Sequence, residues 1–169
     1  FQNAINAGSS VFVPRGTYKV QSLTIATSLT IFGAGDTSHI IRPSGVDTTS
    51  PSATYANLFK ITAHGITVTF RDLKLDGNEV NQIPYEPYGY LIRLTDVAGT
   101  STSTLSIGCD NVTFINATQA ALGLDGDTGT EGLEYITVTN CRFIDGRYGL
   151  AAGNPNAFHR PAMVQITSR

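Results

Sequence analysis

Short segments in which apolar and polar residues alternate recur along the whole chain of 169 residues. Clear examples are residues 11–14, 29–32, 66–70 and 135–138. A period of two places every second side chain on the same face of a β-strand. Gly, Asn, Asp, Pro and Ser lie between the segments, and these residues favour turns. The pattern therefore predicts an all-β chain built from many short strands.

The two ends of the chain suggest that it is part of something longer. Phe1 and Ile5 lie one helical turn apart and Gly8 follows them, which predicts the remnant of an amphipathic helix over residues 1–8. Residues 163–167 have the pattern of a strand with no further segment to cover it. We therefore expect a fragment of a longer chain, with catalytic residues that can lie beyond Arg169.

Internal repetition indicates how the strands are arranged. Residues 66–76, 105–115 and 135–144 align as a strand, a turn that ends in Asp or Asn, and a second strand. The turn residues Asp72, Asn111 and Asn140 are 39 and 29 positions apart (111−72 and 140−111). Such a period is typical of a solenoid whose insertions are absorbed in loops. Asn and Asp tolerate left-handed backbone angles, so these turn residues are expected to stack.

A third strand follows in each repeat, at residues 90–94, 120–126 and 148–153. Three strands per repeat predict a three-faced solenoid in which neighbouring repeats pair in parallel at about 4.8 Å. The alternative is a β-sandwich whose segments are similar by accident. Sandwiches need hairpins, and the Asn-Gly or Asp-Gly loops that favour them do not separate neighbouring strands here.

Three phrases resemble those of a known superfamily. VFVPRGTY at residues 11–18 resembles the opening of pectate-lyase-like β-helices, and LTIFGAG at residues 29–35 and LKLDGN at residues 73–78 resemble later phrases. The resemblance implies an all-β, right-handed parallel β-helix with three strands per coil. Residues 1–169 would form the N-terminal part of one such domain, with a capping helix remnant at 1–8 and coils over 11–169.

The same resemblance implies a carbohydrate-active protein. Phage tailspikes and secreted polysaccharide-degrading enzymes commonly carry this opening, so we expect binding and cleavage of a polysaccharide of capsule, O-antigen or pectic type, by hydrolysis or elimination. It also implies an extracellular place, on a virion tail or after secretion, and a homotrimer by analogy with tailspikes. The alternatives are a non-catalytic glycan-binding adhesin or shaft, and an epimerase.

The resemblance places a sugar-binding groove on the face of the third strands. With Leu122 and Leu124 pointing inward, Gly123 and Asp125 point outward and Arg93 lies beside Gly123. Hydrolysis needs two carboxylates about 5–10 Å apart, and Asp125 and Asp127 would lie about 6–7 Å apart on a continued strand. The candidates for catalysis are Asp125, Asp127, Asp76 and Asp145, and those for substrate binding are Arg93, Arg147, Tyr88, Tyr90 and His159. The plainer interpretation is that these acids are turn residues and that the cations are solvated.

Composition and charge exclude several classes of function. The formal net charge is −2 and no basic stripe exists, so no nucleic-acid partner is expected. No apolar run is long enough for a membrane-spanning helix, so membrane insertion is not expected. The repeat alignment places Cys109 beside Val138 and Cys141 beside Val112, with opposite side-chain parity, which predicts no disulfide. No metal-binding motif is present, and we expect no cofactor.

Overall fold

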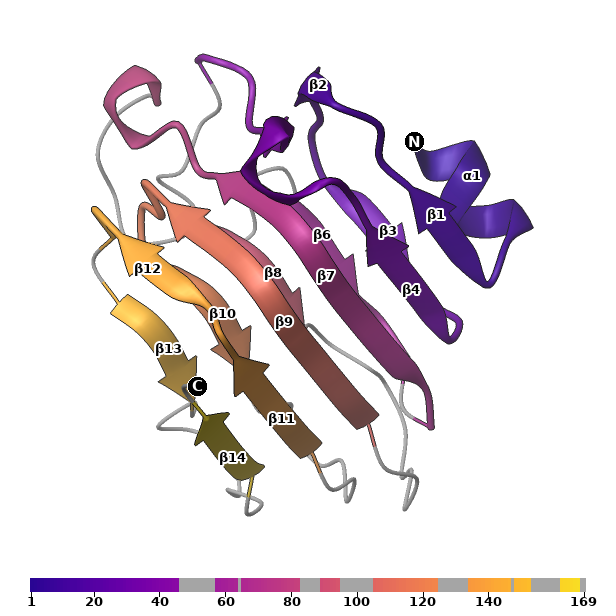
Figure 1. The fold of residues 1–169 in the computed structure, drawn as a ribbon. Helices are drawn as coiled ribbons and strands as arrows, with labels where there is room; N and C mark the ends of the chain where they lie inside the picture. Colours follow the sequence, from indigo (N-terminus) through magenta and orange to yellow (C-terminus); the bar gives the residue numbers. More distant parts are fainter. Residues whose placement is uncertain are drawn as a thin grey trace.

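The structure, a computed structural model, describes residues 1–45, 57–63, 65–82, 89–94, 105–124, 134–146, 148–152 and 162–167. In this part of the chain, one short α-helix precedes strands that form two parallel sheets, which lie one behind the other in Figure 1. The helix is α1 (Gln2–Ala7), and the short 3-10 helices are η1 (Gly35–Thr37) and η2 (Glu79–Asn81).

The larger sheet has nine strands and the smaller has five. The nine-stranded sheet contains β1 (Ser10–Phe12), β2 (Gly16–Lys19), β4 (Leu29–Phe32), β5 (Ser38–Ile41), β7 (Thr67–Asp76), β9 (Leu105–Ile115), β11 (Glu134–Thr139), β12 (Arg142–Ile144) and β14 (Ala162–Thr167). The five-stranded sheet contains, in spatial order, β13 (Tyr148–Ala152), β10 (Ala120–Leu124), β8 (Tyr90–Leu94), β6 (Phe59–Ile61) and β3 (Leu23–Ile25). All of the pairings between these strands are parallel, as the repeat pattern predicted.

The expected right-handed β-helix with three strands per coil is wrong. The described strands form flat parallel sheets that do not curl into a closed helix. The physical reason lies in β7 and β9, which are single strands of 10 and 11 residues where the sequence predicted two strands each. The turn residues take a left-handed φ but interrupt the ladder for one pair only, because Arg71 pairs with Asp110 before them and Leu73 pairs with Val112 after them. The first and second strands of each repeat, which were predicted to form two faces of the solenoid, therefore lie in one sheet.

The predicted alignment of the turn residues is confirmed. Asp72, Asn111 and Asn140 have φ angles of 55°, 53° and 54°, in the left-handed region that Asn and Asp tolerate better than most residues. Strand register places them side by side, and the Asn111 amide donates a hydrogen bond of 2.7 Å to Asp72 Oδ1. The Asn140 amide donates to Asp110 Oδ1 at 3.4 Å. A left-handed Asp or Asn therefore recurs at the same register position in three successive repeats, although Asn140 bonds to Asp110 and not to its direct neighbour Asn111.

The hydrophobic core lies between the two sheets. Phe70 and Phe114 point inward from the nine-stranded sheet, and Phe59 and Ile92 point inward from the five-stranded sheet, all of them buried. The rings of Phe59 and Phe70 meet edge to face with centroids 5.0 Å apart, which joins the two layers directly. Burial of such large apolar side chains is the main favourable term in the stability of the fold.

Helix α1 covers one edge of the five-stranded sheet. Ile5 is buried in the core, and the Gln2 side chain reaches the main chain of Thr24 in the edge strand β3. Gln2 Nε2 donates to the Thr24 carbonyl at 2.9 Å, and the Thr24 N–H donates to Gln2 Oε1 at 2.8 Å. No helix in the described residues is long and apolar enough to cross a membrane.

The two cysteines are free, so the prediction that they form no disulfide is confirmed. Cys109 lies beside Val138 in the ladder, as the alignment required. Burial raises the pKa of the Cys109 thiol well above its usual value, and burial also raises that of Cys141. Both side chains therefore stay protonated at neutral pH, and Cys109 acts as a small apolar filler of the core.

The stacked turn gives the first prediction. Asn111→Ala should lower the free energy of unfolding by about 1.5–3 kcal/mol, because alanine is strained at a left-handed φ and cannot bond to Asp72. Asn111→Gly should cost less than half as much, because glycine adopts this φ without strain. Urea unfolding of both variants provides the measurement, and equal losses would show that the backbone angle is unimportant.

Candidate functional site

A row of polar side chains crosses the outer face of the nine-stranded sheet, and we call it the polar row. It consists of Thr17 (β2), His39 (β5), Lys74 (β7), Thr113 (β9) and Arg142 (β12). Each of these residues is the direct ladder partner of the next. The neighbours of Lys74 along its strand, Leu73 and Leu75, point into the core, so alternation directs the row outward.

His39 and Asp76 form the most ordered pair beside this row. His39 Nε2 lies 3.1 Å from Asp76 Oδ2. The other carboxylate oxygen, Oδ1, accepts hydrogen bonds from the Asn78 N–H at 2.7 Å and from the Asn116 amide at 2.9 Å. An ionised carboxylate can only accept, so Nε2 of a neutral His39 carries the proton and its Nδ1 keeps the lone pair.

The surroundings of His39 favour its neutral form. Burial lowers the pKa of the imidazole, and the positive charge of Lys74 lowers it further. The hydrogen bond to Asp76 and the negative charges of Asp76 and Asp36 act in the opposite direction, but the net shift is downward. His39 is therefore mostly uncharged at neutral pH while its side chain remains 16% exposed.

Arg142 is fixed at one end of the polar row. Its Nε and Nη2 atoms donate to Thr113 Oγ1 at 3.2 and 3.0 Å. Nη2 also pairs with the carboxylate of Asp36, which lies in η1 and is 106 residues away in sequence. Helix η1 packs beside β7 and β9, so the loop that carries Asp36 borders the row. The Arg142 side chain is nevertheless 61% exposed and can contact a ligand.

Arg42 lies completely buried behind Asp76. Its main-chain N–H donates to the Asp76 carbonyl at 3.0 Å, and its Nη2 donates to the Tyr90 carbonyl at 3.2 Å. Nη1 is 3.4 Å from Thr118 Oγ1, and Nε has no hydrogen-bond partner among the residues that the structure describes. Burial lowers the pKa of Arg42 to about 10, and the nearby charge of Asp76 opposes this shift. Arg42 therefore remains a cation at neutral pH and fixes three segments around Asp76.

Asp76 was predicted as a catalytic acid, and the structure gives its carboxylate a different environment. Both of its oxygens are occupied by hydrogen-bond donors, and the side chain is only 7% exposed. It lies where it can orient His39 rather than attack or protonate a substrate itself. His39, Lys74 and Arg142 were missed by the sequence analysis. His39 lies in β5, outside the three aligned repeats, and only the pairing of β5 with β7 brings it to Asp76.

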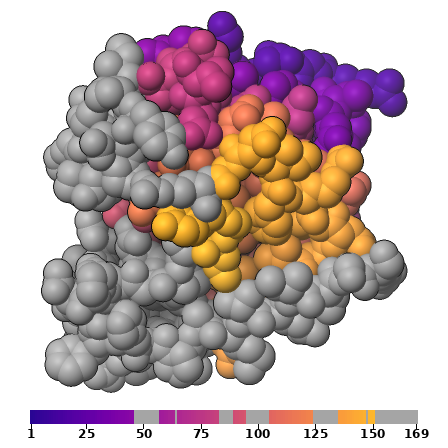
Figure 2. All heavy atoms as spheres, turned by 90° about the vertical axis from the view of Figure 1, so that its left-hand side faces the viewer, coloured from indigo at the N-terminus to yellow at the C-terminus, as the bar shows by residue number. Residues whose placement is uncertain are grey.

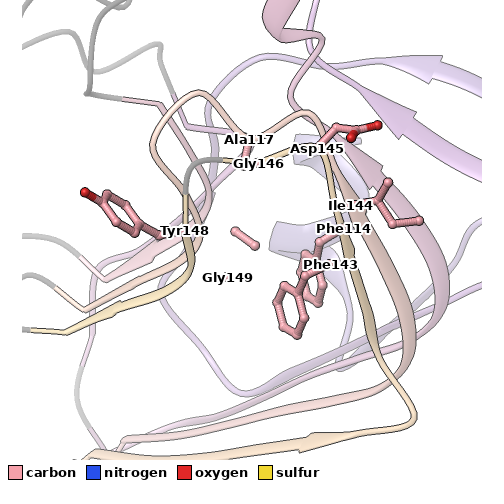
Figure 3. A pocket seen from close by; sticks show the side chains of 9 residues that line it. Phe114, Ala117, Phe143, Ile144, Asp145, Gly146, Tyr148 and Gly149 are labelled. Atoms are coloured by element: carbon pink, nitrogen blue, oxygen red, sulfur yellow. The ribbon is translucent and has the colours of Figure 1, made fainter.

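Asp145, another predicted catalytic residue, lies in a left-handed turn with φ of 50°. It lines a small hollow of about 60 Å³ near the end of the sheets, where residues 134–146 and 148–152 form part of the surface (Figures 2 and 3). The stacked rings of Phe114 and Phe143, 5.0 Å apart, form part of its wall. Asp145 is the one acid among the described residues that line this hollow, so the hollow lacks the second acid that glycoside hydrolysis needs.

Arg93 and Tyr90, predicted to bind substrate, are brought together on the outer face of the five-stranded sheet. Arg93 pairs with Gly123 across the strands, as expected, and its guanidinium carbon lies 5.1 Å from the centre of the Tyr90 ring. A Cβ atom at Gly123 would lie 2.1 Å from Tyr90 Cδ1, so the glycine makes room for this ring. Tyr90 is buried and supports Arg93 instead of offering an exposed surface to a sugar.

The other predicted site residues lie outside the described residues. These are Asp125, Asp127, Arg147, Tyr88 and His159. Their proposed roles therefore stay predictions. Within the described ranges, no group of three or more His, Cys, Asp or Glu side chains could hold a metal ion.

Comparisons of this chain with protein-family models, with curated proteins and with solved structures find no match.

The His39 environment predicts how stability depends on pH. The pKa of His39 is lower in the folded chain than in the unfolded chain, so below about pH 6.5 the unfolded chain binds more protons. The free energy of unfolding should therefore fall as the pH decreases from 7 to 5. His39→Asn should remove that part of the decrease. Urea unfolding at both pH values measures it, and identical pH dependence in the two proteins would contradict the prediction.

The contact between Gly123 and Tyr90 gives a prediction with a matched control. Gly123→Ala should lower the free energy of unfolding by about 1–3 kcal/mol, because the methyl group must displace the Tyr90 ring. Gly108→Ala also lies in a strand, but its nearest contacts would be ordinary, at 3.5–3.7 Å, so it should be neutral or slightly stabilising. Thermal unfolding of both variants distinguishes crowding from a general intolerance of alanine.

Proposed function

We propose that this chain is carbohydrate-active, that it binds a polysaccharide along the polar row, and that it takes part in cleaving the bound chain. The observation that carries the proposal is the register of the row, which aligns one outward side chain on each of five adjacent strands. Thr113 is only 5% exposed and accepts hydrogen bonds from Arg142, so the side chains that a ligand can contact are those of Thr17, His39, Lys74 and Arg142. Adjacent strands lie about 4.8 Å apart, which is close to the length of one sugar unit in an extended glycan. Successive sugars along the row would therefore contact these four side chains, with the Arg142 guanidinium in the place of the buried Thr113.

The charges of the row favour an acidic polysaccharide. Lys74 and Arg142 point outward on the same row, with the hydroxyl of Thr113 between them. Ammonium and guanidinium groups are the protein groups that pair best with carboxylates. The likeness of residues 11–18 to the opening of polysaccharide-degrading proteins agrees with this proposal. A capsule, O-antigen or pectic substrate would place the protein outside the cell, after secretion or on a virion tail.

One observation favours a second candidate function, glycan binding without hydrolysis. The carboxylates of Asp72 and Asp76 accept hydrogen bonds that organise turns, and Asp145 sits in a left-handed turn. In glycoside hydrolases, two carboxylates flank the scissile bond with one protonated and one ionised. The described acids do not form such an exposed pair. A glycan-binding role without cleavage therefore remains the alternative proposal.

Substitutions on the two sheets should show which sheet binds the polysaccharide. Lys74→Ala should weaken binding of an acidic polysaccharide by about 5- to 10-fold, because one charge-assisted contact is lost. Arg71→Ala, which removes an exposed cation from the same strand, should leave affinity unchanged. Affinity electrophoresis in gels that contain polygalacturonate or alginate provides the measurement. Loss of binding in Arg93→Ala but not in Lys74→Ala would move the site to the five-stranded sheet.

A further inference from the structure

In the His39–Asp76 pair, the Asp76 carboxylate accepts a hydrogen bond from the imidazole and so orients it as a possible base. Asp76 is fixed by two further donors, so it holds the imidazole in one orientation and one tautomer. The Nδ1 atom, which carries the lone pair, is the nitrogen left to accept a proton. Because Asp76 is only 7% exposed and its oxygens are already occupied, His39 is the member of the pair that a ligand can reach.

The neighbours of His39 match the needs of an elimination better than those of a hydrolysis. Hydrolysis requires two carboxylates, whereas elimination requires one base and a cation that neutralises the carboxylate of the sugar. Lys74 is the direct ladder partner of His39 on the adjacent strand. A sugar unit whose carboxylate contacts Lys74 would therefore lie beside the imidazole.

We propose that His39 is the catalytic residue that removes a proton when this chain cleaves an acidic polysaccharide by elimination, and that Asp76 is its positioning residue. The inference rests on the proposed function and names the residue that performs its chemistry.

The step balances with no redox partner. His39 Nδ1 takes the proton from the ring carbon next to the sugar carboxylate, and the electrons of that C–H bond form a carbon–carbon double bond. The glycosidic C–O bond on the adjacent carbon breaks, and its electrons go to the leaving oxygen. This oxygen takes the proton back from the His39 imidazolium, directly or through a water molecule that is itself reprotonated by His39, which restores the neutral imidazole. Lys74 neutralises the carboxylate and stabilises the charge that develops on it.

The charged groups around His39 keep it suited to this task at neutral pH. Lys74 and Asp76 face it from β7, and Asp36 faces it from η1. Burial and Lys74 together favour the unprotonated form, which is the form that can act as a base. The rate should therefore increase as the pH rises through the range in which His39 loses its proton, and then stay constant near neutral pH.

The test measures the absorbance of the new double bond when the 169-residue chain acts on polygalacturonate, alginate or a glucuronate-containing capsular polysaccharide. The wild-type chain should release unsaturated products from at least one of them. His39→Ala should be slower by about 100-fold or more while binding is retained, which is the usual effect of losing a general base. Added imidazole should restore part of the rate in His39→Ala, which a misfolded variant would not show.

Asp76→Asn tests the positioning role. The asparagine side chain has one acceptor oxygen for the donors of His39, Asn78 and Asn116, so it fixes the His39 tautomer less well. The rate should therefore fall and the pH profile should shift, while affinity for the polysaccharide changes little. Arg71→Ala serves as the control with unchanged rate. A merely structural Asp76 would lower the amount of folded enzyme without moving the pH profile.

Three results would overturn the inference, and they are distinct. If His39→Ala cleaves as fast as the wild-type chain, His39 is not the base, although the proposed function stands. If the wild-type chain binds the polysaccharides without releasing unsaturated products, the elimination is wrong and binding alone stands. If the wild-type chain neither binds nor cleaves any of them, the proposed function and this inference fail together.

Discussion

The rest of this structure depends on one constraint: β7 and β9 stay paired in parallel on both sides of their left-handed residues. At Asp72 and Asn111 the backbone takes a left-handed φ, yet strand pairing resumes at the very next residue. A break at these points would uncouple the two halves of β7 and β9. Because the pairing continues, the outer side chains keep one register from β2 to β12, and the polar row exists only because of that register.

The internal repeats of the sequence predicted much of the fold. The alignment of Asp72, Asn111 and Asn140 predicted parallel pairing, the place of Cys109 beside Val138, and the place of Arg93 beside Gly123. The repeats do not determine whether the strands close into a three-faced helix, and the prediction that they do so was wrong. A left-handed turn residue bends a strand or separates two strands, and the sequence alone cannot distinguish these outcomes, because both use the same residue type at the same position.

The candidate site was less accessible to sequence analysis. Asp76 was noticed because it lies in a repeated phrase, but its role depends on donors from Asn78 and Asn116 that only the fold brings together. His39 is 37 positions away from Asp76 and belongs to no repeat. Long-range pairs of this kind leave no local pattern. The burial that lowers the pKa of His39 likewise depends on packing against strands that are distant in sequence.

The contact between Gln2 and Thr24 has a broader meaning for parallel sheets. The outermost strand of a sheet exposes unpaired N–H and C=O groups, which other chains can recruit into aggregates. The primary amide of Gln2 offers one donor and one acceptor, and it occupies both main-chain groups of Thr24 at once. It thereby acts as a one-residue imitation of the neighbouring strand that β3 lacks. Ending a sheet need not require another domain, since a single side chain on a six-residue helix can satisfy the edge at this position.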